Sequence, residues 1–160
     1  MSNDGRHDFD FLFGSWRIHN RKLKNNLDRG CTEWIEFDMS LDARPILGGI
    51  GNIDESATTL PDGTNFQGMS LRLFDPEENV WRIWWSSTTL PGRLDPPVVG
   101  QFVAGRGEFV CDDIIGGEPA KVRYEWTGTT TDSPAWQQDF SFDDGKTWDP
   151  PNWIMTFSHT

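Results

Sequence analysis

Apolar side chains alternate with polar ones along most of this chain, and this two-residue period limits the fold more than any other feature. In residues 35–41 every second residue is apolar, and residues 122–126 and 153–159 repeat the pattern with aromatic side chains at several positions. A period of two places alternate side chains on opposite faces of a strand, one face packed and the other wetter. The chain is therefore predicted to be built from strands.

About ten such segments follow one another, and short turns rich in Gly, Pro, Asp and Asn separate them. One helical turn is expected within residues 7–14. Sequential strands with short connections favour an antiparallel meander, and closing the meander removes its exposed edges. We therefore predict an all-β chain that forms one domain over residues 1–160, a single antiparallel up-and-down β-barrel. The expected strands cover residues 16–24, 35–41, 46–55, 66–74, 80–87, 98–104, 108–114, 122–126, 136–142 and 153–159.

Charge and cysteine content narrow the range of partners. The chain of 160 residues carries 14 basic and 25 acidic residues, a net charge of −11, which repels phosphate backbones and anionic lipid. Roles on nucleic acid or on a membrane surface are therefore not expected. The first residues lack the basic and apolar regions of a secretory signal, and Cys31 and Cys111 are predicted to be free buried thiols. We expect a cytoplasmic protein without a metal site or cofactor.

The stretch Ser141 to Trp148 fits the pattern Ser-x-Asp-x-Gly-x-Thr-Trp, the Asp-box of sialidases and other β-propellers. A propeller would repeat the pattern blade by blade, and here it occurs once. The same residues can build a hairpin: Asp143 caps the turn, Gly145 takes a positive φ, and Trp148 packs beneath. We interpret the motif as structural.

Gly14-Ser15-Trp16 matches the Gly-x-Trp that opens the first strand of lipocalins and related calycins. The chain as a whole resembles an uncharacterised family of bacterial calycin-like proteins, through stretches such as "FDFLFGSWRIHNRKLKNNL", "LRLFDPEENVWRIWW" and "FSFDDGKTWDPPNWIMTFSH". The resemblance implies a lipocalin-type barrel but no activity. Kinship with calycins in general suggests binding of a small apolar ligand, which is an argument from the fold alone.

Polar residues on three consecutive predicted strands form the candidate site. Asn52 and Asp54 share a phase on one strand, Arg72 lies on the next, and Arg82 and Trp84 lie on the third. If these residues face the interior, Arg72 can hold a carboxylate headgroup while Trp84 covers an apolar tail. If they face outward, they form a solvated rim. With one polar residue from the ninth predicted strand, the predicted ligand-binding set is Asn52, Asp54, Arg72, Trp84 and Gln138.

Two histidines bear on other hypotheses. His159 is in phase with the apolar face of the last strand, and in the haem-binding calycin relatives called nitrobindins a histidine late in the chain ligates iron. The alternative is that His159 packs near Trp16, where many lipocalins have an arginine. His19 is out of phase with Trp16 and is expected to face solvent.

Three functions stay open from the sequence. The first is binding of a small hydrophobic ligand inside the barrel, and one form of this hypothesis has the ligand carry an anionic group. The second is a small barrel enzyme that uses Asp54 or Glu36 as a base and Arg72 as its electrostatic partner. The third is a structural or homodimeric module whose interior is filled by its own aromatic residues. A cavity of roughly 300 Å³ or more favours the first two.

Overall fold

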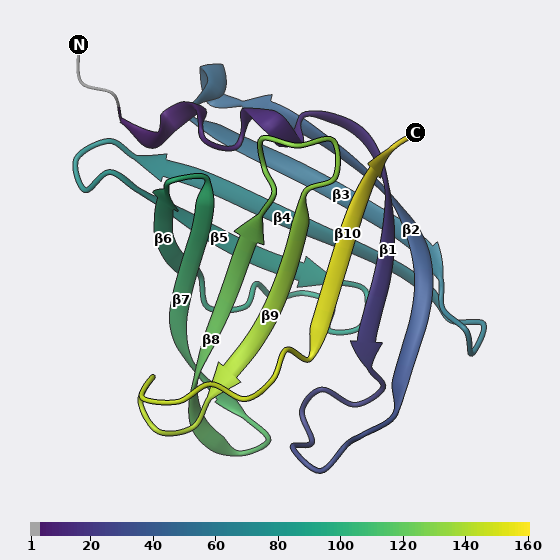
Figure 1. The fold of residues 1–160 in the computed structure, drawn as a ribbon. Helices are drawn as coiled ribbons and strands as arrows, with labels where there is room; N and C mark the ends of the chain where they lie inside the picture. Colours follow the sequence, from purple (N-terminus) through teal and green to yellow (C-terminus); the bar gives the residue numbers. More distant parts are fainter. Residues whose placement is uncertain (1–3) are drawn as a thin grey trace.

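The computed structural model describes residues 4–160 and has ten strands that form one closed antiparallel barrel (Figure 1). The strands follow the predicted segments closely. They are β1 (Gly14–Leu23), β2 (Trp34–Ile46), β3 (Gly51–Thr59), β4 (Asn65–Asp75), β5 (Val80–Ser87), β6 (Val98–Val103), β7 (Arg106–Ile115), β8 (Glu118–Thr127), β9 (Ala135–Ser141) and β10 (Trp153–His159).

The topology is up-and-down, because each strand pairs with its neighbours along the chain and the last strand returns to the first. Trp16 to Lys22 of β1 pair with Trp153 to His159 of β10, and Figure 1 shows these two strands side by side, purple and yellow. The closure leaves no edge strand. The predicted all-β up-and-down barrel is confirmed. Within residues 4–160, no helix is both long enough and apolar enough to cross a membrane.

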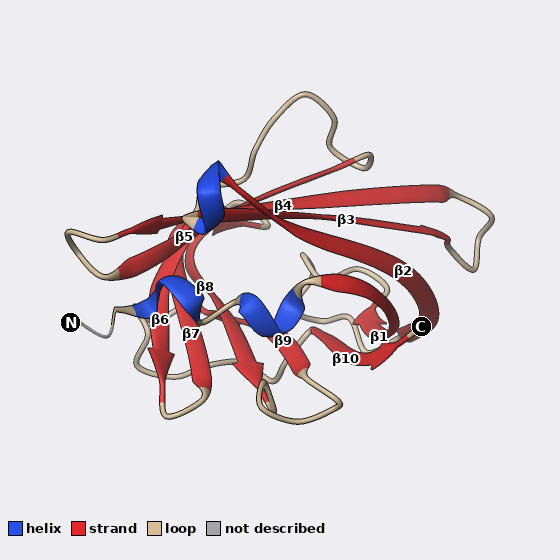
Figure 2. Cartoon of the chain, turned by 90° about the horizontal axis from the view of Figure 1, so that it is seen from above, coloured by secondary structure: helices blue, strands red, loops and turns tan. Residues whose placement is uncertain are grey.

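The N-terminal segment closes one end of the barrel. Two 3-10 helices, η1 (Gly5–His7) and η2 (Asp10–Leu12), lie across this end, which Figure 2 views from above. Phe9 and Leu12 are fully buried there, and the Phe9 ring meets the rings of Trp81 and Trp126 edge to face. The indole of Trp16 donates a hydrogen bond to the carbonyl of Leu12 at 2.7 Å. The helical turn expected before the first strand thus acts as a plug.

The prediction of one continuous strand over residues 46–55 is wrong at its start. Strand β2 ends at Ile46, and a 3-10 turn, η3 (Leu47–Gly49), precedes β3. Gly48 and Gly49 have φ of 67° and 96°, a left-handed conformation that glycine adopts without steric cost. The two glycines therefore reverse the chain at this point.

The connection after β9 has the structure predicted for residues 141–148. The carboxylate of Asp143 accepts hydrogen bonds from the backbone N–H and the hydroxyl of Thr147 at 2.8 and 2.5 Å, which lower its pKa to about 2. Gly145 has a φ of 82°, and the ring of Trp148 lies 4.0 Å from the guanidinium of Arg123 on β8. The motif is a turn that also covers the outside of β8.

Candidate functional site

Three of the five predicted site residues meet inside the barrel. Asn52 and Asp54 on β3 and Arg72 on β4 are 1%, 2% and 4% exposed. Nη2 of Arg72 lies 2.5 Å from Oδ2 of Asp54, and Nη1 donates to Oδ1 of Asn52 at 3.0 Å. Of the two orientations that the sequence left open, the inward one is found. We call Asn52, Asp54, Ser56 and Arg72 the polar strip; Ser56 follows on the same face of β3.

Trp84 is not part of this group, and its assignment to the same face is corrected. In the β4–β5 pair Arg72 lies opposite Ile83, whereas Trp84 lies opposite Leu71. Side chains of directly opposed residues share a face, so Ile83 points inward with Arg72, and Trp84 points outward with Leu71. Arg82 is outward too, and its guanidinium binds Asp75 at 2.9 Å.

Gln138 on β9 faces the interior and is buried, but it belongs to another part of it. Its amide donates to Oδ1 of Asn152 at 2.9 Å, and in register it lies between Tyr124 of β8 and Trp153 of β10. The indole of Trp153 in turn donates to Oδ1 of Asn20 at 2.9 Å. Gln138 thus pairs with Asn152, and Asn20 pairs with Trp153, in hydrogen bonds separate from those of the polar strip.

The polar strip is not fully satisfied. Within residues 4–160, Nδ2 of Asn52, Nε of Arg72 and Oγ of Ser56 are buried and have no hydrogen-bond partner. On the side of the plug, the guanidinium of Arg72 lies 5.1 Å from the centre of the Phe9 ring. The strip thus extends from the plugged end along β3 toward the middle of the barrel.

Away from the plug, several inward-facing side chains keep contact with solvent. They share the phase of buried core residues in their strands, yet each is only half-buried; they are Lys22, Phe37, Trp85, Cys111 and Tyr124. We call them the open-end residues. The predicted binding set did not include Trp85 or Tyr124, although the alternation of residues 122–126 had placed Tyr124 on the apolar face.

Burial changes the chemistry of the open-end residues. It raises the pKa of the Cys111 thiol to about 12, with the nearby carboxylates of Asp113 and Asp112 adding to the effect. Burial also raises the pKa of the Tyr124 hydroxyl and lowers that of the Lys22 ammonium. The thiol and the phenol therefore stay neutral at pH 7. Both cysteines are free and half-buried, not fully buried as predicted.

An open groove of about 790 Å³ lies at this end of the molecule, between the β7–β8 hairpin and the loop after β9. Asp113 and Ala120 in its wall share the inward phase of Cys111 and Val122, so the groove adjoins the open end of the barrel. Its lining combines apolar side chains with charged ones: Pro96, Ile114, Pro119, Ala120 and Phe142, then Asp112, Asp113, Lys121, Asp143, Asp144 and Lys146.

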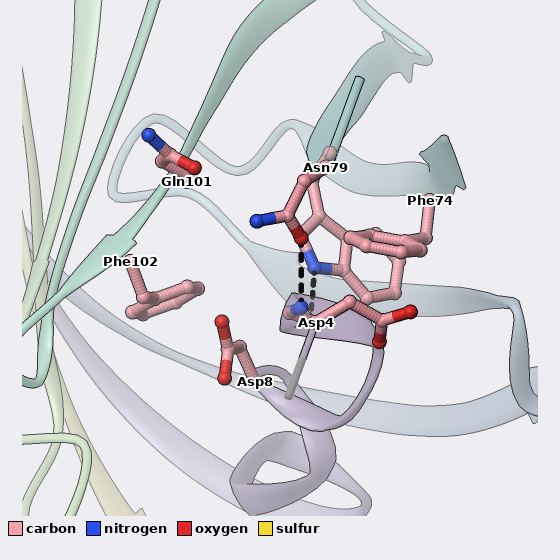
Figure 3. A pocket seen from close by; sticks show the side chains of 8 residues that line it. Asp4, Asp8, Phe74, Asn79, Gln101 and Phe102 are labelled. Carbon is pink, nitrogen blue, oxygen red and sulfur yellow. Dashed lines mark hydrogen bonds between the residues drawn. The ribbon is translucent and has the colours of Figure 1, made fainter. Parts of the chain in front are cut away.

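A smaller hollow of about 200 Å³ lies beside the plug (Figure 3). Asp4 and Asp8 line it, and burial raises the pKa of the Asp8 carboxyl. The backbone of Gly5 joins the plug to the barrel here, because its N–H donates to Oδ1 of Asn79 and its carbonyl accepts from the indole of Trp81, both at 2.9 Å. The volume of this hollow is below the range of usual ligand pockets. We therefore interpret it as part of the contact between the plug and the barrel, and not as a binding site.

The other predicted side chains lie away from the interior. The ring of His159 stacks on Trp16 with centroids 4.0 Å apart, as in the second interpretation of this residue. Glu36 is on the outer face of β2, where Oε1 lies 3.0 Å from Nε2 of the exposed His19. Glu36 therefore cannot be an interior base. Across residues 4–160, no group of three or more His, Cys, Asp or Glu side chains is arranged to hold a metal ion.

No protein-family model matches this chain, and no curated protein is significantly similar to it.

Proposed function

We propose that this protein binds a small, mainly apolar molecule, which enters the barrel between the open-end residues. The observation that carries the proposal is the difference between the two ends. Phe9 and Leu12 are completely buried at one end, with the half-buried Phe11 and Phe102 beside them, whereas the inward-facing Trp85 and Tyr124 stay partly in contact with solvent away from the plug. A sealed core would bury all of these rings, since large aromatic side chains gain most from burial.

The surroundings of the open end support a ligand of this kind. Aromatic rings dominate the interior wall, with Trp85 against Trp153 and Trp153 against Trp136 at centroid distances of 6.2 and 5.8 Å. The adjoining groove has a volume within the ~300–1,000 Å³ of small-molecule sites. Membership of a calycin-like family, which we infer from the sequence resemblance, fits the same role.

A barrel enzyme is the weaker proposal. Asp54 and Arg72 do converge inside the barrel, as the enzyme hypothesis requires. However, the Asp54 carboxylate lies 2.5 Å from the guanidinium of Arg72, and this contact occupies the group that would have to reach a substrate. Binding without chemistry needs no free carboxylate.

Tryptophan fluorescence tests the proposal. A fluorescent hydrophobic probe or a medium-chain aliphatic molecule is expected to change the emission saturably, with micromolar affinity or about −8 kcal/mol. Cys111→Phe places a bulky ring among the open-end residues and is expected to weaken binding at least tenfold. Val110→Phe adds a larger ring at the adjacent residue, which faces outward and is half-buried like Cys111, and serves as the matched control.

Near-ultraviolet circular dichroism of both variants verifies that they fold. Equal affinity in the two folded variants would place binding outside the barrel. If no apolar compound binds saturably, the proposed function is wrong and the filled structural module becomes the better description.

A further inference from the structure

Within residues 4–160, four buried atoms of the polar strip have no hydrogen-bond partner: the donors Nδ2 of Asn52, Nε of Arg72 and Oγ of Ser56, and the acceptor Oδ2 of Asp54, which lies 2.5 Å from Nη2 of Arg72 in the ion pair. Leaving a buried polar group unpaired destabilises the folded state, because the group loses its hydrogen bonds to water without replacing them. Most buried polar atoms in native proteins therefore have a partner, from protein, ordered water or a ligand. Three such donors in one strip indicate a place where acceptor oxygens belong.

The direction of these groups follows from the contacts they already make. Oδ1 of Asn52 accepts from Nη1 of Arg72, so turning the amide over would set two donors against each other. Its Nδ2 is therefore the atom of the amide that remains free to donate to another group. The guanidinium nitrogens Nη1 and Nη2 face Asn52 and Asp54, which leaves Nε as the third donor. The strip therefore offers N–H and O–H groups.

The strip carries no net charge, because the carboxylate of Asp54 lies 2.5 Å from the guanidinium of Arg72. An anionic headgroup placed on Nε of Arg72 would approach this carboxylate and be repelled by it. Inside a medium of low dielectric constant such repulsion is much larger than in water. A neutral oxygen, in a hydroxyl or a carbonyl, accepts the same hydrogen bonds without this repulsion.

Ser56 connects the strip to the open end. A Cβ atom added at Gly68 would lie 2.3 Å from Cη2 of Trp85 and 2.9 Å from Oγ of Ser56, so the bare glycine gives the indole its place beside the hydroxyl. A molecule packed against Trp85 therefore comes within reach of Ser56. Trp85 is half-buried and Ser56 is buried, which places the apolar contact nearer to the solvent.

We propose that the donors of Asn52, Ser56 and Arg72 recognise a neutral oxygen of the ligand, so that the barrel selects apolar alcohols or ketones over fatty acids of equal length. This inference rests on the proposed function, and it narrows the ligand class. It replaces the carboxylate headgroup that the sequence had suggested for Arg72.

A matched panel tests this selectivity: a primary alcohol, a methyl ketone, a carboxylate and an alkane of equal chain length, titrated by tryptophan fluorescence at pH 7.5. The alcohol and the ketone are expected to bind about tenfold more tightly than the other two. Ser56→Ala is expected to weaken alcohol binding about fivefold and to leave alkane binding unchanged. Ser40→Ala, on the exposed outer face of β2, is the control and should change neither.

Each outcome decides something different. If the carboxylate binds as tightly as the alcohol or more so, the neutral-oxygen proposal is wrong while the binding function stands. If all four compounds bind alike in the native protein and in Ser56→Ala, ordered water rather than the ligand satisfies the donors. The neutral-oxygen proposal is then wrong, while the binding function stands. If none of the four binds, both proposals fall together.

Discussion

Arg72 and Asp54 show how one residue pair shapes the inside of the barrel. Both side chains are almost completely withdrawn from water, where separating two charges from their hydration costs several kcal/mol for each ion. Their contact at 2.5 Å and the hydrogen bond from Arg72 to Asn52 offset this cost. The pair therefore holds β3 and β4 in register and keeps the polar strip neutral. It adds little stability relative to an apolar pair of the same size.

Arg72→Met is expected to lower the free energy of unfolding by about 3–5 kcal/mol, because it leaves the carboxylate of Asp54 buried without a cation. The double variant Asp54→Leu/Arg72→Met removes both charges and is expected to recover most of this loss. Urea denaturation followed by circular dichroism measures both. A single variant as stable as the native protein would show that water reaches Asp54.

The loop of residues 141–148 shows how a short element stabilises the outside of the barrel, although some of its side chains also line the adjoining groove. Asp143 organises the turn through Thr147, and Trp148 then covers Arg123, whose Nε also lies 2.9 Å from Oδ1 of Asp139 on β9. The covered ion pair explains why Asp139 is buried although it faces the outside of the barrel. The element therefore acts as an external clamp on β8 and β9.

Gly145→Val is expected to destabilise the protein by about 1–3 kcal/mol, because a β-branched residue resists the φ of 82° that this position requires. Ligand affinity in the folded fraction should not change, because Gly145 lies outside the barrel interior and does not line the adjoining groove. Gly30→Val is the control: it lies in an exposed loop, and its φ is outside the left-handed region. Thermal unfolding of both variants provides the comparison, and equal melting temperatures would contradict this account of the turn.

At the scale of the whole molecule, the barrel is closed but unevenly paired. Strands β5 and β6 are in register only from Trp81 to Ile83, opposite Val98 to Gly100, whereas β1 and β2 pair over the whole length of β1. Beyond Ser87 the chain leaves the sheet in a long connection before β6 begins. The pairing between β5 and β6 is therefore the weakest pairing of neighbouring strands in the barrel.

Hydrogen exchange should detect the weak pairing between β5 and β6. Amides of β6 are expected to exchange through local opening at least tenfold faster than those of β1 and β2, because fewer ladder hydrogen bonds must break together. Mass spectrometry of peptides from a timed exchange series measures the difference. An apolar ligand bound at the open end should slow exchange in β5, which carries Trp85. Uniform protection of all ten strands would show that the barrel opens only as a whole.

The sequence by itself determined the strands and their closure. A two-residue period is a local property, and ten sequential strands with short turns leave the meander barrel as the economical way to remove exposed edges. The turn of residues 141–148, the helical turn before β1 and the outward position of His19 followed in the same way. Each of them depends on residues that are close together in the chain, or on the phase of a single strand.

Only the tertiary structure decided what lies inside. On β4 and β5 both faces carry large apolar side chains: Leu71 and Leu73 lie on the face opposite Arg72, and Trp84 is next to Trp85. Alternation then separates two faces without saying which one is buried. The choice depends on the register across the β4–β5 turn, which set Arg72 against Ile83 and left Trp84 outside. That register brings side chains that are distant in the sequence into one buried interior. The ion pair between Arg72 and Asp54, and the unpaired donors beside it, result from this arrangement.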